Sequence, residues 1–346
     1  MVNGGRRTAP AMPLYKKNNR IYGAYGSTLV ASKDVWQSVE MLTTIMSGHI
    51  NNVHVTDNQT VLVTTAPTPN NPRSGSELWR MRFGNSPITP TKVYDFKWGT
   101  HVWRDSFTSK GNVVFAVDYG SNDGNIYRST DDGQTWSMVW SIPQDEIIGG
   151  GHHIHTIQLD PYTDILWGGR GDTRQEIFFL EPPNYDVRTI KLPGHMPTAI
   201  EVTPDYVLFG NDENPINGIT RYTKATDTFD IVLDLQGTEF NTPIFGITTD
   251  EKTGYMYAMN VGLAGQSDIY TLGAWRSSGD YSQWELIYSI PFSEIDSNGV
   301  QNLVGVIDGI LLSAMGHRTG IRVSQPRGFG LFVSPQRNQE GVIEHA

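Results

Sequence analysis

The sequence of 346 residues contains no cysteine. Disulfide bonds, thiolate metal ligands and cysteine nucleophiles are therefore excluded together. The absence does not indicate a compartment, because a chain without thiols suits reducing and oxidising surroundings alike. Long apolar runs are also missing: no stretch reaches the ~18 residues that a membrane-spanning helix needs. We therefore expect no membrane insertion.

The start of the sequence shows no basic segment followed by an apolar stretch, so we expect no secretion signal. The formal net charge of −10 argues against a nucleic-acid partner. Residues 1–19 are polar and locally basic, and we expect them to form a flexible or docking arm. Residues 20–346 show no linker or break in composition, which predicts a single domain.

Helical periodicity is absent beyond about two turns. Short runs rich in aromatic and β-branched residues alternate instead with Gly, Asn, Asp and Pro, a pattern typical of strands and turns. Phosphate-binding loops, zinc-protease helices and the nucleophile turn of serine hydrolases are all missing. The sequence therefore predicts an all-β protein with no specific catalytic motif.

A recurring unit runs through the chain: an apolar strand, a polar turn that usually contains Asp, and a second apolar strand. Phe245 to Asp250 followed by Tyr255 to Ala258 is one example. These turns recur about every 50 residues, which is the length of a four-stranded blade. They lie near residues 57, 110, 160, 205, 250 and 308.

The segment from Ser129 to Trp136 reads Ser-Thr-Asp-Asp-Gly-Gln-Thr-Trp. Its aspartate can accept backbone hydrogen bonds, and Gly133 can adopt a positive φ, so it predicts a tight turn between antiparallel strands. It resembles the Asp-box of sialidases and related repeat proteins, which joins the outer strands of β-propeller blades. The resemblance implies a structural role for Ser129, Asp131, Gly133, Thr135 and Trp136.

We therefore expect a β-propeller of six four-stranded blades, with seven left open by further strand-like runs at residues 20–31 and 321–334. The last unit lacks a clear fourth strand. Leu29 to Val39 resembles a shortened Asp-box hairpin, and Ser277 to Trp284 resembles a second degenerate copy. We expect N-terminal strands, ending with this first hairpin, to complete the last unit, because closure removes exposed sheet edges.

The most distinctive polar segment follows three glycines and reads His152-His153-Ile154-His155. His153 and His155 are two apart on an expected inner strand, so they should face the same side. They could cap a loop, contact an anionic glycan or bind a divalent metal ion; no cofactor is firmly indicated. The further ligand-binding candidates are His101, His195, Arg104 and Arg170.

With Asp160-Pro161-Tyr162, the histidine segment resembles a pattern found in some bacterial and phage Asp-box repeat proteins. The resemblance implies a non-enzymatic recognition or assembly propeller in a phage tail or fibre, which binds host-surface glycan or other virion proteins. Such a protein would work in the virion or outside cells, and a homo-oligomer is compatible with this role.

The alternative is a carbohydrate-active enzyme, either a sialidase-like glycoside hydrolase or a polysaccharide lyase. Sialidases need three arginines and carry an Arg-Ile-Pro motif, from which Arg20-Ile21-Tyr22 departs at the proline. Aromatic rings near the expected inner strands could stack on sugars in either class. These are Trp98, Trp103, Trp167, Tyr119 and Tyr162.

Overall fold

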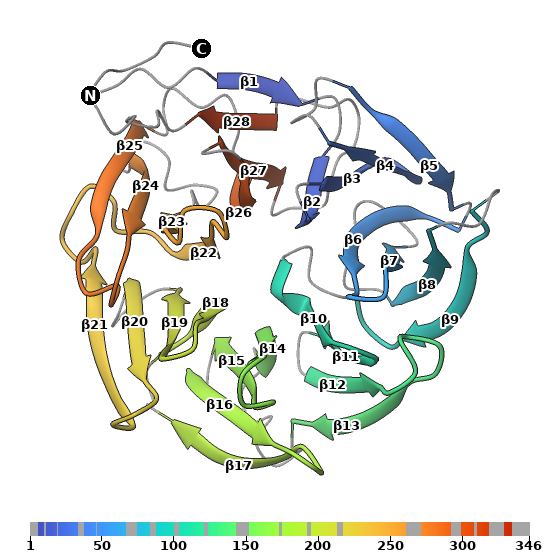
Figure 1. The fold of residues 1–346 in the computed structure, drawn as a ribbon, viewed down its shortest axis with the longest axis horizontal. Coiled ribbons are helices and arrows are strands. Elements are labelled where there is room, and N and C mark those ends of the chain that lie inside the picture. The colour runs from blue at the N-terminus through green and yellow to red at the C-terminus, as the bar shows by residue number, and fades with distance from the viewer. Residues whose placement is uncertain are drawn as a thin grey trace.

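The computed structural model describes residues 6–9, 12–18, 20–33, 38–45, 47–66, 75–83, 88–99, 104–120, 124–142, 152–172, 175–191, 195–212, 217–260, 271–291, 299–307, 310–317 and 329–333. Their strands form seven antiparallel sheets of four strands, arranged as blades around a common axis (Figure 1). We call the strands of each blade A to D from the axis outward. The chain is therefore an all-β propeller.

Blade one contains β2 (Met12–Lys17), β3 (Arg20–Tyr25), β4 (Thr28–Ser32) and β5 (Glu40–Thr44). Blade two contains β6 (His49–Val55), β7 (Thr60–Ala66), β8 (Ser76–Arg82) and β9 (Thr91–Phe96). Blade three contains β10 (Phe107–Lys110), β11 (Val113–Tyr119), β12 (Gly124–Ser129) and β13 (Ser137–Ser141), preceded by the 3-10 turn η1 (Arg104–Ser106). Blade four contains β14 (His152–Leu159), β15 (Leu166–Asp172), β16 (Glu176–Glu181) and β17 (Asp186–Lys191).

Blade five contains β18 (Pro197–Val202), β19 (Tyr206–Asn211), β20 (Gly218–Thr223) and β21 (Thr228–Asp234). Blade six contains β22 (Ile244–Thr249), β23 (Met256–Asn260), β24 (Thr271–Ser277) and β25 (Glu285–Pro291). Blade seven contains β26 (Gly299–Ile307), β27 (Ile310–His317), β28 (Phe329–Val333) and, as strand D, β1 (Arg6–Ala9). Among the described residues, no helix is long and apolar enough to cross a membrane.

The predicted propeller is confirmed, and its seven four-stranded sheets match the larger of the two blade counts that the sequence left open. Residues 12–44 form a complete blade, whereas the sequence divided them between an arm and a closing hairpin. The repeat pattern missed this blade because its first strand, Met-Pro-Leu-Tyr-Lys-Lys, carries a proline and ends in two lysines. Its AB turn also lacks the aspartate that marks most other units.

The N-terminal segment closes the ring, as predicted, but with a different strand. β1 pairs with β28, and Arg7 lies opposite Leu331 in this antiparallel pair. The segment from Leu29 to Val39 instead belongs to blade one, where it includes most of β4. The expected arm was likewise wrong for residues 6–9 and 12–17, since both segments are strands.

The six predicted inner strands surround the axis as β6, β10, β14, β18, β22 and β26, and β2 is the seventh (Figure 1). In six of the seven AB pairs the register shifts within strand A, in the first half of the strand in all but β26, so a β-bulge recurs around the ring. A bulge bends its strand and increases the local twist. In blade four the extra residue of the bulge is His155, between Ile154 and Thr156.

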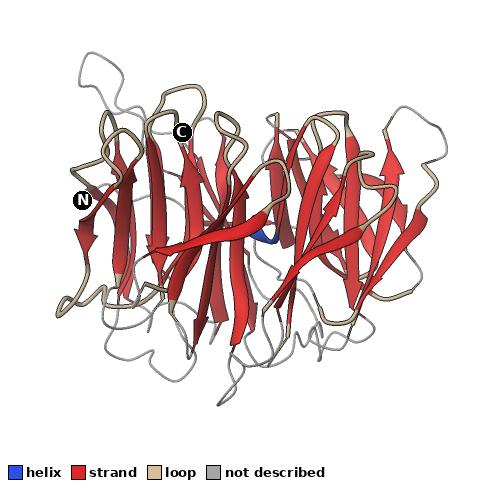
Figure 2. Cartoon of the chain, turned by 90° about the horizontal axis from the view of Figure 1, so that it is seen from below, coloured by secondary structure: helices blue, strands red, loops and turns tan. Residues whose placement is uncertain are grey.

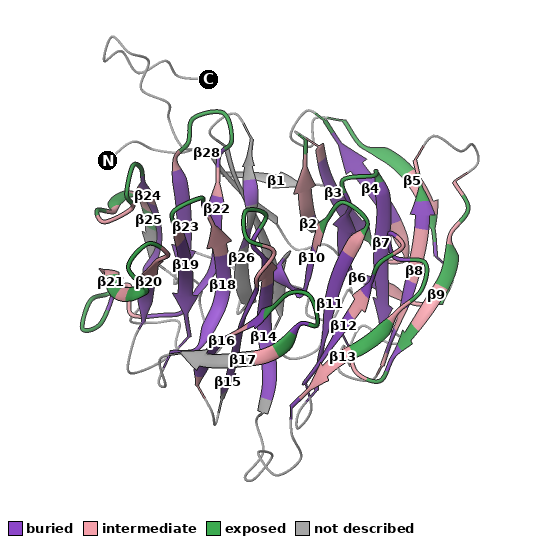
Figure 3. Ribbon diagram, turned by 60° about the horizontal axis from the view of Figure 1, so that its bottom comes forward, coloured by how far each residue is buried: buried purple, intermediate pink, exposed green. Residues whose placement is uncertain are grey.

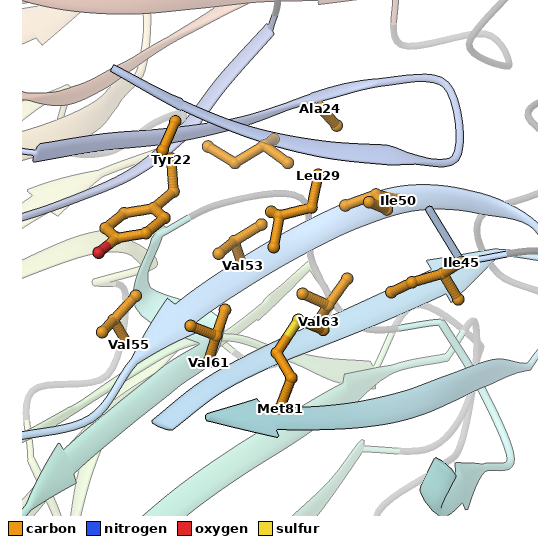
Figure 4. Packing of buried hydrophobic residues seen from close by; sticks show 12 residues of the cluster. Tyr22, Ala24, Leu29, Ile45, Ile50, Val53, Val55, Val61, Val63 and Met81 are labelled. Carbon is orange, nitrogen blue, oxygen red and sulfur yellow. The ribbon is translucent and has the colours of Figure 1, made fainter. Parts of the chain in front are cut away.

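The apolar core lies between neighbouring blades rather than on the axis. Figure 4 shows Tyr22 and Leu29 of blade one against Val53, Val61 and Val63 of blade two. Figure 2 shows the propeller from the side: most strands run up and down the view, and the short 3-10 turn lies among them. Burial follows the same geometry: inner strands are buried, whereas exposed residues gather on outer strands such as β5, β9 and β13 (Figure 3).

The predicted turn at Ser129–Trp136 joins β12 to β13, strands C and D of blade three. The Asp131 carboxylate accepts hydrogen bonds from the amide of Gln134 at 3.0 Å and the amide of Thr135 at 2.8 Å. Gly133 has a φ of 82° and donates its amide to Ser129 Oγ at 2.9 Å. The Trp136 indole donates to the Gly133 carbonyl at 3.1 Å, so the segment is a self-contained turn.

The degenerate copy repeats part of this geometry in blade six. The Trp284 indole donates to the Tyr281 carbonyl at 3.1 Å, three residues earlier, as Trp136 does. Asp280 accepts the Ser282 amide at 3.0 Å. Both copies lie between strands C and D, which confirms the position predicted for them.

Replacing Asp131 should destabilise the fold in a pH-dependent way. Partial burial acts to raise the pKa of Asp131, but hydrogen bonds from Thr135, Ser129 and Gln134 outweigh it and hold that pKa at about 2. Asp131→Ala should lower the free energy of unfolding by about 1–2 kcal/mol at pH 7. Because the folded pKa is depressed, this difference should persist above about pH 4 and disappear as the pH falls towards 2. Chemical denaturation across this pH range measures it, with Asp205→Ala, an exposed turn residue of blade five, as control; equal curves for wild type and Asp131→Ala would contradict it.

Removing β1 should destabilise the closed ring. Deletion of residues 1–9 leaves the edge of β28 without its partner strand and should lower the free energy of unfolding by roughly 2–4 kcal/mol. Deletion of residues 1–5 is the matched control and should have a much smaller effect. If denaturant titration finds the two truncations equally stable, β1 does not close the ring.

Candidate functional site

Polar side chains, all but one of them buried, gather where blade four meets blades three and five. We call this group the central polar cluster: Asp105, His153, His155, Arg170, Glu176 and the half-buried Tyr119. The residues come from η1, β11, β14, β15 and β16, so strands A, B and C all contribute. The predicted candidates His153, His155 and Arg170 are brought together here.

His153 and His155 lie on the same side of β14, as their spacing predicted, with ring centroids 4.6 Å apart. Their Nε2 atoms are 2.7 Å apart. A contact this short holds one hydrogen, so one Nε2 donates and the other accepts, and both rings cannot carry a proton on Nε2. Since the residues are only 3% and 2% exposed, the pair is an interior contact rather than an open ligand surface.

The histidine pair packs tightly against neighbouring blades. The Tyr119 ring of blade three lies 4.1 Å from the His153 ring, measured between centroids. A Cβ added to Gly171 would overlap the Met196 sulfur and the His155 ring, so glycine is required at that position. The pair therefore fills the junction of blade four with blades three and five.

Arg170 is 1% exposed, and its guanidinium is neutralised inside blade four. Its Nε and Nη2 donate to the same Glu176 oxygen at 2.9 and 2.5 Å. The two residues lie directly opposite each other in the β15–β16 pair. Removing either partner would leave a buried charge unpaired, which is strongly unfavourable.

Asp105 connects three blades from the 3-10 turn. Its carboxylate accepts the Ile200 amide of blade five at 3.1 Å, and its backbone carbonyl accepts the Thr156 hydroxyl of blade four at 3.3 Å. The side chain is 5% exposed. Within the cluster, Asp105 therefore bonds three blades to one another.

The other predicted candidates are more scattered. His195 is buried immediately before β18, and the structure describes only the backbone of Arg104 and His152. His101 and Trp103 lie outside the described residues. The predicted aromatic Trp167 packs in the core against Phe179, Phe209 and Tyr222, so it is not available for sugar stacking. Tyr162 is 56% exposed, and Trp98 is half-buried.

Within the described part of the chain, no three histidine or acidic residues lie close enough to hold a metal ion. The sequence analysis also missed Asp105 and Glu176, which complete the cluster, and Met196, which lies beside it. No local motif marks these residues, because their partners lie on other strands or blades. Ligand binding by His153, His155 and Arg170 therefore stays a prediction.

A further histidine, His54 on β6, is buried between blades. Its Nε2 lies 2.8 Å from Ser109 Oγ of blade three, and its ring stacks on Phe107. Burial lowers the pKa of His54 to about 3, and the positive charge of Lys17 adds to this effect. The negative charges of Asp57 and Asp132 act to raise the pKa but offset only part of the decrease. His54 is therefore neutral at physiological pH.

This neutral histidine should weaken the fold in mild acid. Between about pH 6.5 and pH 3 the unfolded state binds a proton that folded His54 does not, so stability falls as the pH falls. From pH 7 to pH 4.5 the free energy of unfolding should drop by about 2–3 kcal/mol more in the wild type than in His54→Gln. Denaturant titrations at both pH values test this, with His49→Gln on the same strand as control. A wild-type pH dependence retained by His54→Gln would contradict it.

Neither a family model nor a curated protein sequence matches this chain. Solved structures do match at the level of fold. The GH74 xyloglucanase of Xanthomonas campestris is 11% identical with a TM-score of 0.65, over 96% of this chain and 57% of that one. The GH74 enzyme of Niastella koreensis is 12% identical with a TM-score of 0.58, over 83% of this chain and 47% of that one. This chain thus spans about half the length of these two enzymes.

YCF48 bound to D1 peptide is 12% identical with a TM-score of 0.60, over 97% of this chain and 96% of that one. Enzymes and a peptide-bound protein therefore share this architecture at similarly low identity. Such similarity shows the fold alone, because one fold carries many functions.

Proposed function

We propose that this chain is a non-enzymatic recognition or assembly propeller that binds glycan. The observation that supports it most is that three buried carboxylates of blades three and four and of η1 are engaged by the protein itself. Glu176 pairs with Arg170, and Asp105 accepts the Ile200 amide. Asp118 accepts the Asn125 amide at 2.9 Å and the Tyr127 hydroxyl at 2.8 Å.

Glycoside hydrolysis generally needs two carboxyl groups that flank one sugar bond, one of them free to donate a proton. Carboxylates held by structural hydrogen bonds are poorly suited to this task. The geometry therefore favours recognition over a hydrolase that uses two carboxyl groups. The alternative is a sialidase-like hydrolase, which uses a tyrosine nucleophile, or a polysaccharide lyase, and the test below addresses it. The fold shared with GH74 enzymes does not change this balance.

An exposed aromatic ring offers the best sugar contact among the predicted residues. Tyr162 lies in the AB turn of blade four, where the Asp160 carboxylate accepts its amide at 2.8 Å. Lys224 Nζ lies 5.1 Å from the centre of the ring and is itself bound to Asp160 at 2.7 Å. A ring held in this way can stack on a sugar with little loss of conformational freedom.

We extend the proposal to a setting in a phage tail or fibre, where the propeller would meet host-surface glycan or other virion proteins. The support is the sequence pattern that combines the histidine segment with Asp160-Pro161-Tyr162. In that setting the protein works in the virion or outside cells.

Glycan-array binding of the wild type, Tyr162→Ala and Tyr25→Ala tests the proposal. Tyr25 is 60% exposed and is the last residue of β3, next to the BC turn and so at the opposite end of its blade from the AB turn. It is therefore the matched control. We expect Tyr162→Ala to weaken binding about fivefold or more and Tyr25→Ala to leave it unchanged. The same glycans, incubated with the wild type, should show no new reducing ends. Cleavage would favour the enzyme instead, and binding that ignores Tyr162 would refute this contact.

A further inference from the structure

A cavity of about 350 Å³ opens on blade one, beside its AB turn. It is lined by Lys17, Asn18, Arg20, Tyr22, Lys33 and Gln59. Three of the six lining side chains are cations, in a chain whose formal net charge is −10. The cavity is therefore a local positive site on an acidic protein.

Comparison of blade one with blade two shows which residues of blade two are equivalent to these cations. Ile21 pairs with Ser32 in blade one as Val61 pairs with Met81 in blade two. Arg20 and Lys33 thus take the positions of Thr60 and Arg82. Lys17 pairs with Arg20, and Thr56 likewise bonds across to Thr60.

In blade two the equivalent positions surround a carboxylate. Asp132, from the Asp-box turn of blade three, is 3% exposed. It accepts hydrogen bonds from the hydroxyls of Thr56, at 2.7 Å, and Thr60, and lies 3.5 Å from Arg82 Nη2. These positions of blade two therefore form an anion-binding site, and the Asp132 carboxylate of blade three occupies it.

Blades five and six show a related contact. Arg221 of blade five donates to the backbone carbonyl of Asp280, in the CD turn of blade six, as Arg80 donates to that of Asp132. The segment between β8 and β9 of blade two is different: residues 83–90 include no acidic residue, and Phe83 packs against Tyr22 of blade one. Blade one therefore has three cationic side chains at these positions, and residues 83–90 of blade two contribute no carboxylate to pair with them.

We propose that this blade-one pocket binds the carboxylate of a small ligand, such as a uronic acid. Arg20 is well placed to hold it, since its guanidinium lies 5.4 Å from the Tyr22 ring centre and 5.0 Å from that of Phe83. Tyr22 adds an apolar wall. The site goes beyond the proposed glycan contact and does not include Tyr162.

Two acidic side chains already face the cations from the rim. Asp57 contacts Lys17 at 2.7 Å, and Glu40 contacts Arg20. Their side chains are 49% and 60% exposed, so these are solvent-screened pairs that an entering carboxylate can displace at little cost. Lys33 is exposed and adds a third positive charge at the pocket.

Calorimetric titration of the full chain with glucuronate, and with glucose as the uncharged analogue, tests the site. We expect saturable binding of glucuronate and none of glucose. Arg20→Gln should weaken binding about tenfold, and Lys33→Gln about threefold. Lys92→Gln, an exposed lysine of blade two that also pairs with carboxylates, is the matched control and should bind as the wild type does.

Lys33→Glu is a second variant, needed if Arg20→Gln fails to fold. Because Lys33 is a surface residue, this substitution should not disturb folding. It should abolish glucuronate binding. Tyr162→Ala should leave glucuronate binding unchanged, which separates this site from the proposed glycan contact. Equal binding of glucose and glucuronate, no binding up to about 50 mM glucuronate, or wild-type affinity in Lys33→Glu would each overturn the proposal.

Discussion

Closure of the ring is the constraint on which the rest of the structure depends. From blade one to blade seven, each blade packs apolar side chains against the next. The last blade meets the first where β26 and β27 contact β2, and β1 completes the sheet of blade seven. Polar bonds repeat the arrangement between neighbouring AB turns. Lys17 bonds Asp57, Asp57 accepts the Gly111 amide, and Lys110 bonds Asp164, which links blades one to four in sequence.

The same constraint decides where function can reside. Polar groups of the inner strands take part in contacts between blades: Asp105 bonds to blades four and five, and the Tyr119 ring of blade three packs on His153 of blade four. The two ligand contacts that we propose lie instead at AB turns. Tyr162 and the cationic pocket of blade one are on different blades of the ring. On these proposals, the interior joins the blades and the turns bind ligands.

Sequence patterns predicted the fold class, six of the inner strands and the turn at Ser129–Trp136, because each depends on residues close together in the chain. It missed blade one, whose first strand contains Pro13 and two lysines. It also assigned closure to the wrong strand, since four residues of β1 carry too little pattern to predict their pairing with β28. The proximity of His153 and His155 followed from strand alternation, whereas the Asp105–Ile200 bond joins residues 95 apart and has no local signal.

The most direct test of ring closure uses the absence of cysteine from the chain. In the variant Arg7→Cys/Leu331→Cys the two thiols are the only ones present, at positions that lie opposite each other in the β1–β28 pair. Val39→Cys/Leu331→Cys places one thiol in the hairpin that the sequence alone suggested for closure. After mild oxidation of the folded protein, non-reducing electrophoresis and intact mass should show an internal disulfide in the first variant and none in the second. A disulfide in the second variant only would contradict closure by β1.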